Sequence, residues 1–131
     1  MSTRTSLRPY KAVDSASMAA DITSDVTILQ SITGVSYSLS WTGTSPIGEA
    51  SVEVSNDYAL SADGQTVMNA GTWTTIDLNV SGSPASSISI TGNTGTAFID
   101  IDSIMAYAIR LFYDRTSGTG TLIAYINGKV A

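Results

Sequence analysis

The stretch that decides the fold is residues 35–54, which read VSYSLSWTGTSPIGEASVEV. Apolar side chains occupy every second position from Val35 to Trp41, and again from Ala50 to Val54. A period of two is the side-chain repeat of a β-strand with one buried face. The Gly, Ser and Pro residues between the two halves are typical of a turn. The stretch therefore predicts two antiparallel strands that meet at one corner, over residues 42–48.

The rest of the chain repeats this pattern, in short alternating stretches separated by Gly, Pro, Asn and Ser. Residues 71–80 and 107–113 are strong examples, and residues 116–120 are expected to form a last hairpin before a closing strand at 122–126. About eight short strands with such turns are typical of a sandwich or jelly roll. We therefore predict an all-β protein with a single antiparallel β-sandwich of jelly-roll type.

The length of 131 residues fits one domain with a short extension at its start. Residues 1–11 carry three of the six basic residues, Arg4, Arg8 and Lys11. We expect them to form a flexible or extended basic arm, and residues 12–131 to form the sandwich domain.

The charge pattern bears on the partners of the protein. The formal net charge is −5, and no basic residue lies between Lys11 and Arg110. Most of the chain therefore lacks the cationic footprint that nucleic acid requires, and we expect no nucleic-acid partner. Only 13% of the residues are charged, against roughly a quarter in typical soluble proteins. A surface of hydroxyl and amide groups suits close packing against other subunits.

The chain contains neither cysteine nor histidine. This excludes a cysteine nucleophile, a Ser-His-Asp triad and metal centres built on imidazole or thiolate. We expect no enzymatic activity and no cofactor. No apolar run approaches the roughly 20 residues of a membrane span, and the start of the chain lacks a secretory signal. We therefore expect no membrane insertion, and any role at a cell surface would come by assembly or lysis and not by the general secretory route.

Two acidic residues, Asp100 and Asp102, are the candidates for an ion site or for acid–base chemistry. Their spacing of two places both carboxylates on one face of a predicted strand. Calcium normally takes six to eight oxygen ligands, and the sequence places no further donors nearby. A solvated outer face is the preferred interpretation, and a hydrolase that uses this pair is the weakest hypothesis.

The aromatic residues divide into core and surface candidates. Trp41 continues the apolar face of residues 35–39 and is expected to lie in the core. The alternation does not decide on which face of its strand Trp73 lies, and Tyr58 lies in a predicted turn. Loop aromatics of this kind stack on sugars, and nearby carboxylates bond sugar hydroxyls. Tyr58, Trp73, Asp57 and Asp63 therefore form a candidate glycan site.

The last two predicted strands carry large side chains on both faces. Phe112 opposes Leu111, and Tyr125 opposes residues 124 and 126. A strand buried on both sides of so small a domain implies a covered second face, and a homo-oligomer covers it at least cost. The residues expected to make subunit or capsid contacts are Arg4, Arg8, Tyr10, Lys11, Phe112 and Tyr125.

Five segments carry a family resemblance: 41–48 (WTGTSPIG), 52–57 (VEVSND), 71–76 (GTWTTI), 108–111 (AIRL) and 117–122 (SGTGTL). They resemble small β-sandwich proteins that tailed bacteriophages and prophages encode, and the likeness runs from about residue 8 to the end. The resemblance implies a structural role in the virion, as a head decoration protein, a head fibre or spike, or a tail-tip component. With it comes the expectation of a homo-trimer that contacts capsid or tail proteins. The alternative is a carbohydrate-binding or adhesion module, at a phage tip or free of any virion.

Overall fold

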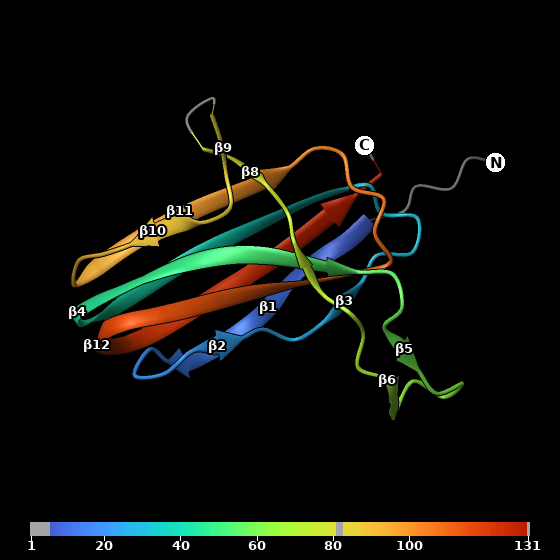
Figure 1. The fold of residues 1–131 in the computed structure, drawn as a ribbon, viewed down its shortest axis with the longest axis horizontal. Coiled ribbons are helices and arrows are strands. Elements are labelled where there is room, and N and C mark those ends of the chain that lie inside the picture. The colour runs from blue at the N-terminus through green and yellow to red at the C-terminus, as the bar shows by residue number, and fades with distance from the viewer. Residues whose placement is uncertain (1–5, 81–82, 131) are drawn as a thin grey trace.

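Two long strands, β4 (Gly34–Ser55) and β12 (Ala108–Lys129), run through the whole molecule and organise its fold. The protein is described by a computed structural model over residues 6–80 and 83–130. Each long strand has 22 residues, and the two pair antiparallel from end to end, Gly34 with Lys129 and Ser55 with Ala108. Both strands bend back at the same end of the molecule (Figure 1). The paired ribbon therefore folds over itself and supplies the centre of two layers.

The first layer contains residues 34–42 of β4 and residues 121–129 of β12. Strand β11 (Thr94–Ile101) pairs with this part of β4 along its whole length. Strand β1 (Ser6–Ser17) pairs with this part of β12 and forms the opposite edge. The strand order of the first layer is therefore β11, β4, β12 and β1.

The second layer contains residues 48–55 of β4 and residues 108–115 of β12. Short strands complete it on both sides: β10 (Ile88–Ile90) and β7 (Thr74–Thr75) pair with β4, and β2 (Ile22–Thr23) and β3 (Thr27–Ile28) pair with β12. Two small hairpins lie outside both layers. They are β5 (Ala59–Leu60) with β6 (Val67–Asn69), and β8 (Leu78–Val80) with β9 (Ser83–Ala85).

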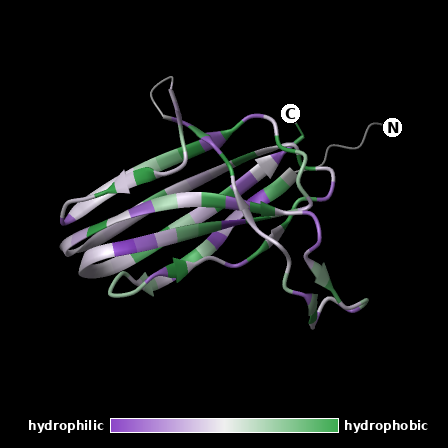
Figure 2. Cartoon of the chain, in the orientation of Figure 1, coloured by the Kyte–Doolittle hydropathy of each residue, from purple (hydrophilic) through white to green (hydrophobic). Residues whose placement is uncertain are grey.

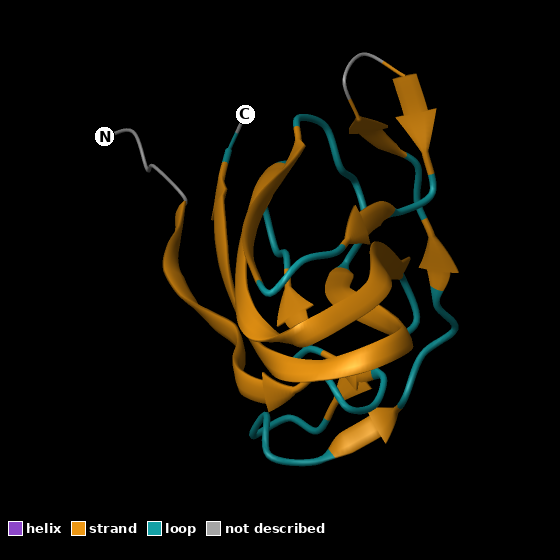
Figure 3. Cartoon of the chain, turned by 90° about the vertical axis from the view of Figure 1, so that its left-hand side faces the viewer, coloured by secondary structure: helices purple, strands orange, loops and turns teal. Residues whose placement is uncertain are grey.

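The corner between the layers contains one extra residue in each long strand. Arg115 pairs with Gly48, Ser117 with Ile47 and Thr119 with Thr44, so the register shifts twice and returns to its former value. One extra residue exchanges the inward and outward positions of a strand, because side chains alternate with a period of two. Inward positions are therefore odd-numbered before the corner and even-numbered after it, in β4 and in β12 alike. Figure 3 views this end, where the strands curl from one layer into the other.

The two strands approach each other at the corner as closely as their backbones allow. Gly118 has a φ of +81°, which favours glycine, and Ser45 opposite it has a φ of +48°. A β-carbon on Gly118 would overlap the carbonyl oxygen of Ser45, and one on Gly43 would overlap that of Thr119. The glycines of the segments expected to form turns therefore allow two continuous strands to bend together.

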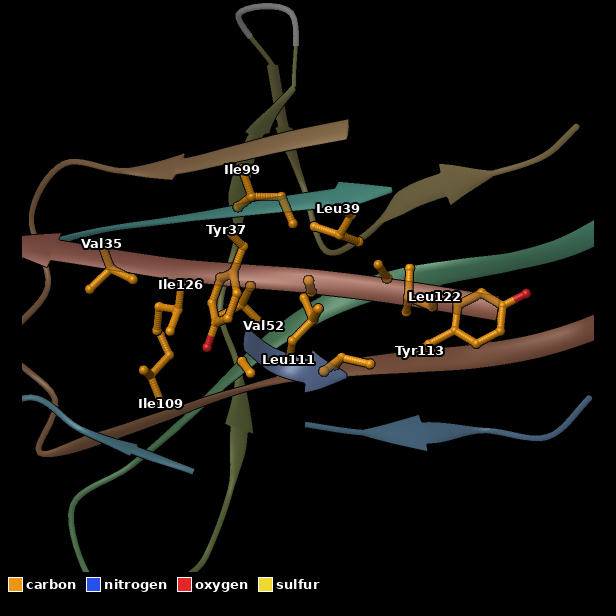
Figure 4. Close-up of a cluster of buried hydrophobic side chains, with 14 of the residues drawn as sticks. Val35, Tyr37, Leu39, Val52, Ile99, Ile109, Leu111, Tyr113, Leu122 and Ile126 are labelled. Atoms are coloured by element: carbon orange, nitrogen blue, oxygen red, sulfur yellow. The ribbon is translucent and has the colours of Figure 1, made fainter. Parts of the chain in front are cut away.

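The core lies between the two layers, whose inward side chains meet there (Figure 4). The first layer contributes Val35, Tyr37, Leu39, Trp41, Ile99, Leu122, Ala124 and Ile126, and the second contributes Ala50, Val52, Ile90, Ile109, Leu111 and Tyr113. Figure 2 shows the resulting alternation of hydrophobic and hydrophilic residues along the long strands. The prediction that Trp41 lies in the core is confirmed: 6% of the residue is exposed, and its indole Nε1 donates to the carbonyl oxygen of Gly92 at 3.2 Å.

The hydroxyls of Tyr37 and Tyr113 are buried in this core and have no hydrogen-bond partner among the described residues. Burial raises the pKa of Tyr37, and it raises the pKa of Tyr113 as well. Both hydroxyls therefore stay neutral, and each has lost its hydration without gaining a bond in the protein.

The fold class predicted from the sequence, an all-β antiparallel sandwich, is confirmed. The prediction of a turn between two paired strands at residues 42–48 is wrong, because residues 34–55 form one strand whose halves lie in opposite layers. The hairpin expected at residues 116–120 is wrong for the same reason. Residues 1–5 of the expected arm lie outside the described residues, and residues 6–11 belong to β1, which continues to Ser17.

Candidate functional site

Three of the four residues predicted to bind a glycan lie together beside the end of β4. The rings of Tyr58 and Trp73 are 5.9 Å apart between centroids and inclined by 57°. Asp57 precedes Tyr58 and bonds Thr72, which precedes Trp73. The end of β4 and the loop before β7 are joined in this way. Beside this join lies a hollow of about 370 Å³, lined by residues 54–57 with Thr72 and Thr74.

The carboxylate of Asp57 holds the two loop segments together. It accepts bonds from the backbone N–H of Thr72 at 2.6 Å, the Thr72 hydroxyl at 3.0 Å and the Ser55 hydroxyl at 2.7 Å. These bonds, that from the Thr72 backbone first, lower the pKa of Asp57 below its usual value. Because both carboxylate oxygens accept bonds within the chain, Asp57 positions the aromatic pair.

One face of the Trp73 ring is covered by an arginine that the sequence analysis did not connect with it. The guanidinium carbon of Arg110 lies 4.1 Å from the ring centroid, and Arg110 Nε donates to Glu53 Oε1 at 2.7 Å. The indole N–H of Trp73 donates to the carbonyl oxygen of Ala70 at 2.8 Å. Arg110 and Glu53 are opposite each other in the β4–β12 register, which the sequence does not reveal. The indole is therefore fixed on one face and at its N–H edge.

Asp63, the fourth predicted glycan residue, is not part of this cluster. It lies in the turn of the β5–β6 hairpin, which projects away from the sandwich in Figure 1. Its carboxylate accepts bonds from the Ser61 hydroxyl and from the backbone N–H of Gln65, and these lower the pKa of Asp63, the Ser61 bond most. Asp63 therefore stabilises the turn of this hairpin.

The predicted contact residues are distributed over both layers. Arg4 lies outside the described residues. Lys11 of β1 is paired with Tyr125 of β12, and its Nζ lies 6.0 Å from the centroid of that ring. Tyr10 bonds Thr27 of β3 through its hydroxyl and so links the layers at one edge. Phe112 pairs with Ser51 in the second layer, so the structure does not bring it near Tyr125.

The outward face of the first layer carries an aromatic pair of which the sequence analysis identified one member. Phe98 of β11 and Tyr125 of β12 are both paired with Ser38 of β4, so they stand on either side of this small residue. Phe98 is 67% exposed and Tyr125 is 42% exposed. Between them lies a hollow of about 450 Å³, to which Ser40 and Thr96 also contribute. The sequence signal that could have identified Phe98 is its alternation with Ala97, Ile99 and Ile101, which places it on the outward side of the strand.

The aspartates proposed as a weak ion site are both exposed. Asp100 is paired with Ser36 at the end of β11, and Asp102 lies just beyond this strand. Both line a shallow hollow of about 160 Å³ that Asn127 and Lys129 also border. Within residues 6–80 and 83–130, no group of three or more acidic side chains is placed to hold a metal ion.

Comparison with known proteins supplies one structural relative. No family model matches the sequence, and no curated protein matches it. In the described part of the chain, no helix is long and apolar enough to span a membrane. The fold is similar to the crystal structure of the SPBc2 prophage-derived protein YomS, with a TM-score of 0.61 and 11% sequence identity. The match covers 97% of this chain and 96% of that chain, so the two proteins share their fold from end to end.

Proposed function

We propose that this protein is a structural component of a bacteriophage particle, with a role in head decoration, in a head fibre or spike, or at the tail tip. It acts through contacts with copies of itself and with neighbouring capsid or tail proteins. The observation that carries the proposal is the fold, which matches a prophage-derived protein over nearly the whole of both chains. The sequence resemblance to small phage sandwich proteins points the same way.

The surface of the sandwich supports a role that depends on contacts. Phe98 is 67% exposed and Tyr125 is 42% exposed in the middle of a β-layer, although exposing large apolar side chains to water is unfavourable. The residue between them, Ser38, is small and polar. Aromatic residues such as this pair are enriched at the centres of protein–protein interfaces.

The test is to look for the protein on purified particles. Phage particles from the host that carries the gene are banded in a density gradient, washed in high salt and probed with antibodies to the recombinant protein. We expect the protein to remain with the particles at a constant number per particle. Gold labelling over the head would assign it to decoration or a spike, and labelling at the tail tip would assign it to the tail. Protein present in the lysate but absent from washed particles would contradict the proposal.

A second candidate function is favoured by one specific observation, the aromatic pair beside a polar hollow. The ring of Tyr58 lies against Trp73, whose second face is turned away from Arg110. The hollow of about 370 Å³ next to them offers Asn56 and Thr74 as bonding groups. This arrangement suits a sugar ring, which needs an apolar platform and bonds to its hydroxyls.

The two functions are separated by a binding assay on a glycan array. If the second candidate holds, the Tyr58→Ala variant loses glycan binding at least about 10-fold, as expected for the loss of an aromatic contact. Leu60→Ala is the matched control, because Leu60 is exposed in the neighbouring strand β5. Equal binding by wild type and Tyr58→Ala would exclude this site.

A further inference from the structure

We propose that the outward face of the first layer joins two copies of this chain about a twofold axis parallel to the strands. We call this surface the first-layer face; it is formed by the outward residues of β11, β4, β12 and β1. The inference concerns the isolated protein, so it does not depend on the particle in which the protein acts. This proposal differs from the trimer expected from the sequence.

First, under such an axis, large side chains of one copy meet small side chains and a hollow of the other. The axis lies in the interface between β4 and β12, so it places β4 of one copy over β12 of the other, and β11 over β1. One row across the four strands contains Phe98, Ser38, Tyr125 and Lys11. The axis therefore places the partner's Tyr125 over Ser38, and Phe98 over the partner's Lys11. The hollow of about 450 Å³ between Phe98 and Tyr125 receives the incoming ring. The same contact occurs twice in the pair.

The second step is that charge is complementary under the same axis. One half of the face, β12 and β1, carries Arg8, Lys11 and Lys129 against a single Asp14, which lies 3.3 Å from Lys11. The other half carries Asp100, followed by Asp102, and contains no basic residue in either strand. The twofold axis places the basic half of one copy over the acidic half of the other. Arg8 lies opposite Asn127, where the register of β1 shifts, and Asn127 and Asp100 are both paired with Ser36. The axis therefore places Arg8 over the partner's Asp100.

The third step is that the area is sufficient. Four strands about 4.8 Å apart, over eight residues of about 3.3 Å each, span roughly 500 Å². Two copies together bury about 1,000 Å², which is the least that a biological interface should bury and is typical of a weak dimer. The outward face of the second layer differs, because Phe112 there is half-buried and lines a hollow together with residues 86–87 and Thr75. The first-layer face is thus the more open of the two.

The first experiment measures the mass of the purified protein by sedimentation velocity over a range of concentrations. We expect a dimer for the wild type, and a rise in its dissociation constant of at least about 100-fold for Phe98→Ser combined with Tyr125→Ser. Met105→Ser is the matched control, because Met105 is 86% exposed but lies outside this face. Circular dichroism verifies that each variant is folded. A wild-type monomer, a wild-type trimer, or a dimer that survives the double substitution would overturn the proposal.

The second experiment tests the twofold axis itself. Arg8→Asp places a carboxylate opposite the partner's Asp100, and Asp100→Arg places a guanidinium opposite the partner's Arg8, so each variant alone is expected to dissociate. An equimolar mixture of the two is expected to restore the dimer, because position 8 of each copy then faces the opposite charge at position 100 of the other copy. Asp77→Arg, an exposed carboxylate in the loop between β7 and β8, is the control for the change in net charge. Failure of the mixture to associate would overturn the arrangement, and glycan binding through Phe98 by a monomeric protein would assign the face to a sugar.

Discussion

The substitution Gly118→Ala tests how the corner of the two long strands is held. Gly118 has a φ of +81°, a conformation that costs an alanine about 1 kcal/mol. Its new β-carbon would overlap the carbonyl oxygen of Ser45 and lie 2.7 Å from the Cα of Pro46. Both are backbone atoms of β4 that cannot rotate away, so the strands must move apart, which costs about 1–3 kcal/mol more. We expect the free energy of unfolding to fall by about 2–4 kcal/mol.

The matched control is Gly64→Ala in the β5–β6 hairpin. Gly64 has a φ of +74°, nearly that of Gly118, but nothing lies within 4 Å of a β-carbon placed there. This variant therefore carries the conformational cost alone, and we expect a loss of about 1 kcal/mol. The difference between the two variants isolates the close approach of the strands.

The measurement is equilibrium unfolding in guanidinium chloride, supported by thermal melts. For a domain of this size each kcal/mol lowers Tm by roughly 3–5 °C, so Gly118→Ala is expected to melt about 6–20 °C below wild type. Gly64→Ala is expected to melt about 3–5 °C below it. Equal losses for the two variants would refute the argument that the corner depends on backbone contact at Gly118.

Three further substitutions test other parts of the molecule. Tyr37→Phe removes a buried hydroxyl that has no partner, and we expect it to raise the free energy of unfolding by about 1 kcal/mol in denaturant titrations; a clear loss would contradict this. Gly95→Ala places a β-carbon 2.6 Å from Cε2 of the Trp41 indole, so we expect a loss of about 1–3 kcal/mol and a red-shifted tryptophan emission; unchanged emission would show that the indole stays in place. The pKa of Asp57 is lowered in the folded state, so the stabilisation from its charge is present above its unfolded pKa near 4 and is lost as the pH falls through the folded value. Asp57→Asn should therefore be less stable than wild type at neutral pH and equal to it in acid, measured as the unfolding midpoint from pH 2 to 7.

The alternation of apolar residues was enough to predict the fold class and the core. Val35, Leu39 and Trp41 face inward as their spacing predicts, because one buried side requires a period of two. The connection between the halves of β4 was not predictable in the same way. Gly, Ser and Pro at residues 43–46 are typical of a hairpin turn, and they equally permit a bulge in a continuous strand. Which of the two forms depends on β12, more than fifty residues later along the chain.

The candidate surfaces were predictable only residue by residue. Tyr58 and Trp73 could be named as surface aromatics, and the structure places them together through Asp57. Phe98 and the ion pair of Arg110 with Glu53 were missed, since each depends on which strands are neighbours and in what register. Register is a property of the assembled sheet, and a single sequence contains no direct record of it.

The sharing of β4 and β12 between both layers affects how the chain folds during synthesis. Their paired residues are about 50 to 95 positions apart, and β12 holds the centre of each layer. Until β12 has left the ribosome, β4 has no neighbour on that side, and neither layer can close over the core. Long-range pairing of this kind folds slowly and exposes apolar strands in the meantime. We therefore expect both layers to close only after β12 is made, and the nascent chain to need protection from aggregation until then.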